Sequence, residues 1–289
     1  MKTNCIIEND NLKALRDLPD RSIDLIYADP PFNTGRDFVS EDGGYTDKPG
    51  IDNQAPMLDP TIDFSWLQDV CTPNQRAYFA MMIPRLLEIE RILKPTGAFY
   101  YHCDWRTSAH IRLILNQIFG QNRFRNEIAW MYQISMPFDT IKNIWKNNYD
   151  AILFYAGKDH AFKPQHHPLT YQQIKEMYPY TDSHGRKYRY KNGLYAERQY
   201  ADENKGTRIG TAWDDISIAT PKERVGYPTQ KPLGLLKRII EASSNEDDIV
   251  LAPYCGSGTT CVAAQQLGRR YIGIDQNSEA IHIAQRRLS

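Results

Sequence analysis

The segment that most constrains the fold is a glycine-rich turn between two short apolar strands, late in a chain of 289 residues. We predict a strand at residues 248–251, a helix at residues 259–267 and a strand at residues 271–274, which ends at Asp275. Two strands joined through a helix form a βαβ unit, in which the strands are parallel. This pattern places the chain in the α/β class, and its length suits one large domain or one domain with an insertion.

The same alternation of strands and helices covers most of the chain. Apolar runs predict strands, and spacings of three and four residues between apolar side chains predict amphipathic helices. The expected sheet is mostly parallel. The predicted strands are 22–27, 98–103, 127–132 and 149–155, and the predicted helices are 9–18, a segment centred on 79–87, 111–118, 233–243 and 278–287.

Two stretches interrupt this rhythm. Residues 157–228 are polar, rich in Tyr, His, Lys and Arg, and poor in aliphatic runs, which predicts an insertion between 1–156 and 229–289. Residues 36–75 show no clear period and hold eight acidic residues against Arg36 and Lys48. A stretch of this length without regular structure predicts a mobile acidic loop.

Composition excludes several classes of protein. Apolar residues make up 41% of the chain and charged residues 24%, as in an ordinary globular protein. No apolar run is long enough for a membrane span, and the first residues are polar, unlike a secretory signal. The five cysteines contain no C-x-x-C pair, and the histidines lack the spacing of a zinc site. We therefore predict a cytoplasmic protein without a membrane segment, a disulfide framework or a metal.

The glycine-rich turn has the composition of a ligand-binding loop. Gly256 and Gly258 permit a close approach of the backbone to a ligand, and Asp275 is placed to accept hydrogen bonds from ribose hydroxyls. The third glycine of a dinucleotide motif is replaced by Cys261, which favours a ligand with adenosine but no pyrophosphate. A tight turn that binds no ligand is the alternative.

A second turn, Asp29-Pro30-Pro31-Phe32, also follows a predicted strand, where open α/β sheets bind their ligands. The exocyclic amine of adenine is a poor nucleophile because its lone pair is delocalised into the ring. A carboxylate and a neighbouring carbonyl, held by two prolines, could each accept one N–H of such an amine. Phe32 offers an aromatic face for an extruded base. From these four residues alone, a rigid turn with a capping Asp remains an equal alternative.

Together, Asp29 to Gly35 and Cys255 to Thr260 resemble the motifs of the DNA amino-methyltransferases, which methylate adenine N6 or cytosine N4 with S-adenosylmethionine. The order, with the catalytic motif before the cofactor motif, resembles the β group of that family. Further matches lie in residues 9–10, 93–97, 101–104, 213–216 and 227–232. The resemblance implies a Rossmann-like methyltransferase fold whose catalytic half precedes its cofactor half, with a target-recognition insertion.

The resemblance also implies roles for particular residues. Asp29 and the Pro30 carbonyl would hold the target amine, with Pro31 stiffening the turn and Phe32 stacking on the flipped base. Asp10 would lie near the cofactor's adenine and Asp275 would hold its ribose. Thr229, Lys231 and Pro232 would close the pocket, although Lys231 could equally be a solvated residue at a helix start. The residues expected to wrap the rest of the cofactor are Tyr254, Cys255, Gly256, Ser257, Gly258, Thr259 and Thr260.

One position departs from the family pattern. Ala252 stands where the family usually has an Asp that reaches the ammonium group of the cofactor. A hydrogen bond to a charged partner contributes about 1.5–3 kcal/mol, so its loss would weaken cofactor binding roughly 10- to 150-fold. Either the family member is weakly active or inactive and serves as a DNA-binding module, or a nearby carboxylate compensates.

Charge is unevenly distributed along a chain whose formal net charge is zero. Residues 123–238 hold 19 basic and 12 acidic residues, and the remainder carries the opposite excess of seven negative charges. Cations alternate with aromatics over Arg186, Lys187, Arg189 and Lys191, a pattern that suits phosphate contact and base stacking. A solvated hairpin surface is the alternative to DNA contact at these four residues.

The sequence thus predicts a site-specific methyltransferase that flips an adenine out of double-stranded DNA and methylates its N6 amine. Adenine is preferred to cytosine because Asp29 leads the motif, where N4-cytosine enzymes more often have Ser. An N4-cytosine enzyme remains an alternative, and by analogy with the family a homodimer is expected.

Overall fold

The computed structural model describes residues 1–34, 37–40, 43–46, 62–132, 143, 145–191 and 197–289. The chain forms two compact units. The first comprises residues 1–163 and 211–289, and the second comprises residues 164–210. The predicted insertion, residues 157–228, contains the second unit and also short flanking segments that belong to the first.

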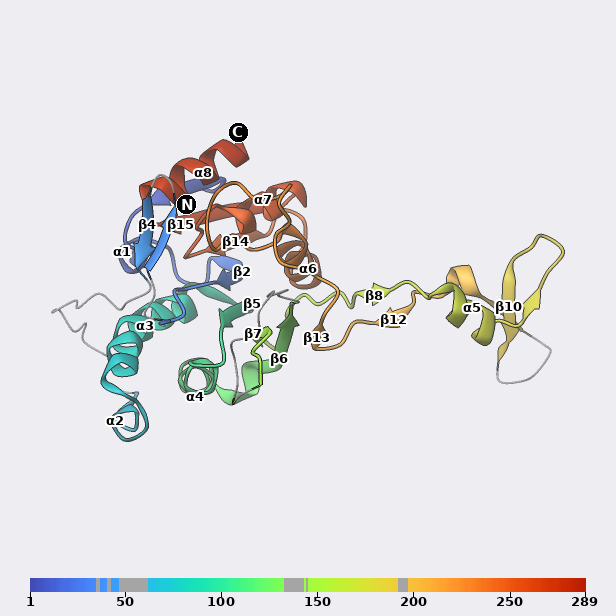
Figure 1. Ribbon diagram of the computed structural model, residues 1–289, viewed down its shortest axis with the longest axis horizontal. Helices are drawn as coiled ribbons and strands as arrows, with labels where there is room; N and C mark the ends of the chain where they lie inside the picture. The colour runs from blue at the N-terminus through green and yellow to red at the C-terminus, as the bar shows by residue number, and fades with distance from the viewer. Residues whose placement is uncertain (35–36, 41–42, 47–61, 133–142, 144, 192–196) are drawn as a thin grey trace. The chain divides into compact units, whose positions relative to one another are not determined.

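The first unit is built on a sheet of eight strands in the order β1-β15-β14-β2-β5-β7-β6-β13 (Figure 1). Only β7 runs antiparallel to its neighbours, β5 and β6, so the predicted mostly parallel sheet is confirmed. The strands are β1 (Cys5–Glu8), β2 (Ile23–Ala28), β5 (Leu93–Cys103), β6 (Phe124–Met131), β7 (Tyr149–Ala156), β13 (Ala212–Trp213), β14 (Ile249–Ala252) and β15 (Arg270–Asp275).

Helices pack against this sheet in two groups (Figure 1). Helices α1 and α4 each contact α3, and their apolar side chains share one core with Ile26, Phe99 and Tyr101 of the sheet. Tyr100 lies between Phe99 and Tyr101 in the strand. Because side chains alternate along a strand, it points to the opposite face, where it hydrogen-bonds Ser243 of α6. The sheet therefore lies between two helical layers. The helices are α1 (Asn11–Arg16), α3 (Pro73–Ile92), α4 (Ser108–Phe119), α6 (Leu233–Ser243), α7 (Thr259–Gln266) and α8 (Ser278–Leu288), with a short 3₁₀ turn at Gln121–Arg123.

Part of the predicted acidic loop, residues 36–75, has regular structure, which corrects that prediction. A hairpin forms from β3 (Asp37–Ser40) and β4 (Gly43–Thr46), and a short helix, α2, covers Leu67–Val70. The long helix α3 already begins at Pro73, because Thr72 and Gln75 form a reciprocal capping box. Residues 36, 41–42 and 47–61 of the predicted loop lie outside the described residues.

A close backbone approach at the end of β7 leads to a stability prediction. The Gly157 amide donates to the Gly97 carbonyl at 3.2 Å, and a Cβ at Gly157 would lie 1.6 Å from the carbonyl oxygen of Pro95. Gly157→Ala should therefore destabilise the protein by about 3 kcal/mol and lower the Tm by about 6–12 °C in calorimetry. Gly210→Ala is the control, because its Cβ would meet no atom within 4 Å; an equal effect of both changes would contradict the steric argument.

The second unit is a small sheet with its own aromatic packing. Strands β9 (Tyr180–Thr181), β10 (Lys187–Tyr190) and β11 (Arg198–Tyr200) pair antiparallel. The rings of Tyr180, Tyr190 and Tyr200 lie 5.3–5.8 Å from neighbouring tyrosine rings in this sheet, and Tyr178 is fully buried. Few aliphatic side chains are needed because aromatic rings fill the core. The other elements are β8 (His166–His167), β12 (Thr207–Arg208), α5 (Tyr171–Met177) and a 3₁₀ turn at Ala201–Glu203.

In the part of the chain that the structure describes, every helix is too short or too polar to cross a membrane.

Candidate active site

The glycine-rich turn joins β14 to α7 in conformations that favour glycine. Gly256 has a φ of +48° and Gly258 a φ of +77°. A Cβ at Gly256 would lie 3.1 Å from the Tyr227 ring, and one at Gly258 would lie 2.7 Å from Cβ of Ala284 in α8. The two glycines therefore allow a tight turn that fits beneath its neighbours, and the first backbone amides of α7, which have no partner within the helix, follow it directly.

Asp275, the last residue of β15, stabilises this turn. The Gly256 amide donates to its Oδ2 at 2.8 Å, and the Asn277 amide donates to its Oδ1 at 3.0 Å. Burial raises the pKa of Asp275, and these backbone donors oppose the rise. Each carboxylate oxygen keeps a lone pair for a further donor, so Asp275 can hold the turn and accept a hydrogen bond from a ligand at the same time.

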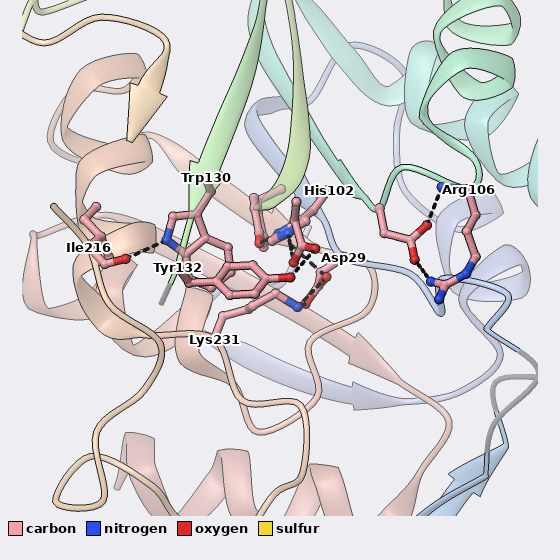
Figure 2. A network of polar contacts seen from close by, with 10 residues as sticks. Asp29, His102, Arg106, Trp130, Tyr132, Ile216 and Lys231 are labelled. Atoms are coloured by element: carbon pink, nitrogen blue, oxygen red, sulfur yellow. Dashed lines mark hydrogen bonds and ion pairs between the residues drawn. The ribbon is translucent and has the colours of Figure 1, made fainter. Parts of the chain in front are cut away.

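The Asp29 carboxylate directly follows β2 and is paired with Lys231. The Lys231 Nζ donates to both carboxylate oxygens, at 2.8 and 2.6 Å (Figure 2). The same ammonium lies 5.1 Å from the centroid of the Phe32 ring. The sequence predicted Lys231 either to close the cofactor pocket or to be a solvated residue at a helix start, whereas the structure brings it into contact with the predicted catalytic carboxylate.

A cavity of about 760 Å³ is lined by both turns. This volume lies within the range typical of small-molecule sites. The predicted residues that line it are Asp29, Pro30, Pro31, Phe32, Asp10, Tyr254, Cys255, Gly256, Ser257, Thr259, Thr260, Asp275, Thr229 and Lys231.

Three predicted cofactor-binding residues do not line this cavity. Ala252 is the buried last residue of β14, Gly258 precedes α7 as its N-cap, and Pro232 precedes α6 as its N-cap. All three shape the backbone of elements whose neighbouring residues reach the cavity.

Other lining residues were not predicted. Gln276 to Glu279 follow Asp275 directly, and Tyr227 and Gln230 belong to the motif at 227–232, so their proximity could have been anticipated. Met81 and Arg85 lie in the middle of α3, where no local signal sets them apart. The unpredicted residues are Asn11, Tyr27, Thr34, Met81, Arg85, Tyr227, Gln230, Pro253, Gln276, Asn277, Ser278 and Glu279.

Arg85 ties α3 to the start of α1. It donates to Asp10 Oδ2 at 2.8 Å and to Asn11 Oδ1 at 2.5 Å. The Asn11 amide in turn donates to the Pro253 carbonyl at 3.0 Å, just after β14. The Arg85 guanidinium neutralises the charge of the Asp10 carboxylate and fixes its orientation. Asp10 therefore offers a ligand a hydrogen-bond acceptor but no net negative charge.

A chain of buried and half-buried polar side chains adjoins Asp29 (Figure 2). The Tyr27 hydroxyl is 2.6 Å from Nδ1 of His102, and Nε2 of His102 is 3.1 Å from Oδ2 of Asp150. The Tyr132 hydroxyl donates to Oδ1 of Asp150 at 3.0 Å. His102 Nδ1 is also 3.8 Å from Oδ1 of Asp29. Tyr27 lines the large cavity, so this chain connects the cavity with a second, smaller one.

The smaller cavity measures about 200 Å³ and is lined by all of residues 227–231. The same residues, apart from Pro228, also line the larger cavity. Asp150, Trp130 and Tyr132 form part of its wall. Lys231 therefore lies at the boundary of both cavities, close to two carboxylates.

In the second unit the four predicted DNA-contacting residues lie on or beside β10. Arg186 forms a bidentate pair with Asp202 at 2.8 Å, which raises its pKa, and Lys191 lies 3.3 Å from Glu197. Arg189 hydrogen-bonds Gln199 at 2.9 Å. The pairs of Arg186 and Lys191 are exposed to solvent and therefore weak, so a phosphate could replace these carboxylates.

Comparison with known proteins gives three kinds of match. The sequence model of a family described as DNA methylase matches residues 23–286. The Type II methyltransferase M.HpaI of Haemophilus parainfluenzae is 30% identical over 98% of this chain and 73% of its own length. The DNA adenine methyltransferase YhdJ of Escherichia coli K12 is 30% identical over 98% of this chain and 82% of its own.

Solved structures share the fold. A complex of M1.HpyAVI with SAM superposes with a TM-score of 0.57 at 20% identity, covering 98% of both chains. The cytosine-N4-specific PvuII DNA methyltransferase gives a TM-score of 0.60 at 13% identity, covering 99% of this chain and 86% of its own. At these identities the likeness concerns the fold, and it agrees with the predicted Rossmann-like methyltransferase architecture.

Proposed function

Since this chain belongs to the DNA methylase family, we propose that it transfers a methyl group from S-adenosylmethionine to the N6 amine of a flipped adenine in a specific duplex sequence. The observation that carries the proposal is one cavity lined by both the Asp29 turn and the glycine-rich turn with Asp275. Methyl acceptor and methyl donor would therefore meet at one place.

The residues of the cavity fit S-adenosylmethionine. This cofactor carries a positive sulfonium and an ammonium group. Four carboxylates line the cavity: Asp10 is paired with Arg85, Asp29 is paired with Lys231, and the other two are Asp275 and Glu279. The amides at the start of α7 suit its carboxylate, and Asp275 suits its ribose. Glu279, which lines the same cavity, is the carboxylate we expect to take the place of the Asp that Ala252 replaces.

The chemistry falls to the Asp29 turn. When bound, S-adenosylmethionine supplies an electrophilic methyl group. The Asp29 carboxylate would accept one N–H of the target amine and the Pro30 carbonyl the other, which draws the nitrogen lone pair out of conjugation and toward the methyl group. Phe32 would stack on the extruded base. As the N–CH3 bond forms and the methyl group leaves the cofactor's sulfur, positive charge develops on the amine nitrogen. The Asp29 carboxylate would stabilise this charge and accept the N–H proton that the nitrogen then loses, before releasing it to solvent.

The direct test is transfer of tritiated methyl groups from S-adenosylmethionine to duplex DNA, RNA and a control without nucleic acid, followed by nucleoside analysis. Label in N6-methyladenine of duplex DNA supports the proposal. Label in N4-methylcytosine would identify the alternative base. No transfer by the wild-type protein, with transfer restored in Ala252→Asp, would identify a DNA-binding relative weakened at the cofactor site.

DNA binding by the second unit gives a separate prediction. Lys187→Ala combined with Lys191→Ala should reduce the slope of log K against log salt by about 0.9 for each phosphate that is no longer neutralised. A filter-binding titration over a series of salt concentrations measures the slope. Lys2→Ala combined with Lys13→Ala removes the same charge from the first unit; an equally reduced slope in this control would argue against a localised interaction.

Duplex DNA as substrate follows from the proposed function, and the homodimer stays an expectation from the family. Analytical ultracentrifugation without DNA measures whether the protein is a dimer. The same measurement with a duplex oligonucleotide gives the number of protein copies bound to each duplex.

A further inference from the structure

His102 is fully buried at the end of β5, yet both of its ring nitrogens have polar partners. Nδ1 meets the Tyr27 hydroxyl at 2.6 Å, and Nε2 meets Asp150 at 3.1 Å. None of the roles assigned above uses His102 or Asp150. Because Tyr27 lines the large cavity beside Asp29, the arrangement of protons in this chain determines what the cavity presents to a substrate.

The charge of Asp150 sets that arrangement. Burial alone would raise the pKa of Asp150, but the hydrogen bond from His102 and the charge of His102, followed by the charge of Lys231 and the hydrogen bond from Tyr132, outweigh it and lower the pKa. An ionised carboxylate only accepts hydrogen bonds, so Nε2 of His102 carries the proton that points to Asp150. In the neutral ring Nδ1 is then an acceptor.

With this neutral tautomer of His102, the Tyr27 hydroxyl donates its proton to Nδ1. Burial, and then the charges of Asp29 and Asp150, raise the pKa of Tyr27 far above its usual value, so the hydroxyl keeps its proton. The remaining lone pairs of the Tyr27 oxygen are left free to accept from a group in the cavity. With Nδ1 protonated the direction would reverse, and the hydroxyl would become a donor to the cavity.

The same imidazole ring supports the aromatic residue of the Asp29 turn. Its centroid lies 5.4 Å from the Phe32 ring, and on another side 5.6 Å from the Trp130 ring in an edge-to-face arrangement. Trp130 is itself fixed by a hydrogen bond from its indole N–H to the Ile216 carbonyl at 2.8 Å (Figure 2). A fixed ring at His102 thus holds Phe32 in place.

We propose that Asp150 is a positioning residue which, through His102, keeps the Tyr27 oxygen as a hydrogen-bond acceptor beside Asp29 and holds Phe32 against the target base. This inference rests on the proposed methyl transfer. The target amine offers only N–H groups and gains positive charge in the reaction, so acceptors around it favour the reaction and a donor opposes it.

The test is Asp150→Asn, which keeps the shape of the side chain but lets its amide donate to Nε2. The ring should then carry its proton on Nδ1 and donate to Tyr27. We expect kcat for DNA methylation to fall about 10- to 100-fold, the range for residues that orient a histidine without themselves contacting the ligand, with the KM for S-adenosylmethionine changed less than twofold.

Two further measurements separate positioning from a structural role. ¹⁵N chemical shifts of the His102 ring should report the Nε2–H tautomer in the wild type and the Nδ1–H tautomer in Asp150→Asn. Tyr27→Phe should lower kcat similarly, and the double variant should lose no more than either single change, because both interrupt one chain. Tyr27→Phe leaves the buried charge in place and so covers the case in which Asp150→Asn does not fold.

Asp24→Asn is the matched control. Asp24 is paired with Lys94 in the first unit and its side chain is 15% exposed, against 12% for Asp150, but it does not line either cavity. Its kcat should equal that of the wild type. An unchanged tautomer or an unchanged kcat in Asp150→Asn would overturn the inference, as would additive losses in the double variant. A wild type that shows the Nε2–H tautomer but transfers no methyl group would instead refute the proposed function.

Discussion

Replacing Asp29 by alanine is expected to lower kcat for DNA methylation by about 10³-fold, because the change removes the acceptor that orients the target amine and stabilises its developing charge. Single-turnover methyl transfer with saturating S-adenosylmethionine measures this loss. Asp29→Asn should lose nearly as much activity. Its amide oxygen still accepts a hydrogen bond, but it carries no charge that could stabilise the developing positive charge on the amine.

Cofactor binding serves as the internal control for Asp29. The affinity for S-adenosylmethionine, measured by calorimetric titration, should change less than about threefold, because the glycine-rich turn and Asp275 are untouched. Asp24→Asn provides the control for removal of a paired carboxylate, since its partner Lys94 lies outside the cavity. Full activity in Asp29→Ala would remove the chemical basis of the proposed function.

Replacing Asp275 by asparagine is expected to weaken S-adenosylmethionine binding by about 10- to 150-fold, the range for loss of a charge-assisted hydrogen bond. One Asp275 oxygen accepts from Gly256 and the other from Asn277. The amide of asparagine would place an N–H against one of these donors and so disturb the turn as well as the ribose contact. Calorimetric titration measures the affinity.

Acidification should have a related effect. Burial raises the pKa of Asp275, so its carboxylate becomes protonated at a higher pH than an exposed Asp would. Affinity for the cofactor is therefore complete above this raised pKa and is lost as the pH falls through it. In Asp275→Asn this step should be absent. The same acid step in both proteins would assign it to another group.

Elements bounded by clear signals were predictable from the sequence. Helix α6 was expected at residues 233–243 and begins and ends there, because Pro232 precedes a regular apolar stripe. Strand β1 was missed because it is a four-residue edge strand with half-buried side chains. The start of α3 was missed because its first turn is polar, although Thr72 and Gln75 carry a capping signal.

The site divides in the same way. Residues at the ends of strands, such as Asp29 and Asp275, were predictable because parallel strands bring these ends together. Pairings over long sequence distances were not, since no local pattern records them. The bond from Lys231 to Asp29 spans 202 residues, and that from Arg85 to Asp10 spans 75. The roles proposed for His102 and Asp150 likewise depend on contacts that only the folded chain makes.

The order of strands has a consequence for biosynthesis. Strand β2, which ends one residue before Asp29, pairs with β14, and β1 pairs with β15, so the first and last strands of the sheet are neighbours. Such contacts have a high contact order and form slowly. During translation the Asp29 turn leaves the ribosome long before the glycine-rich turn does. The Asp29 turn and the glycine-rich turn can therefore line one cavity only after β14 and β15 have been synthesised and have paired with β2 and β1.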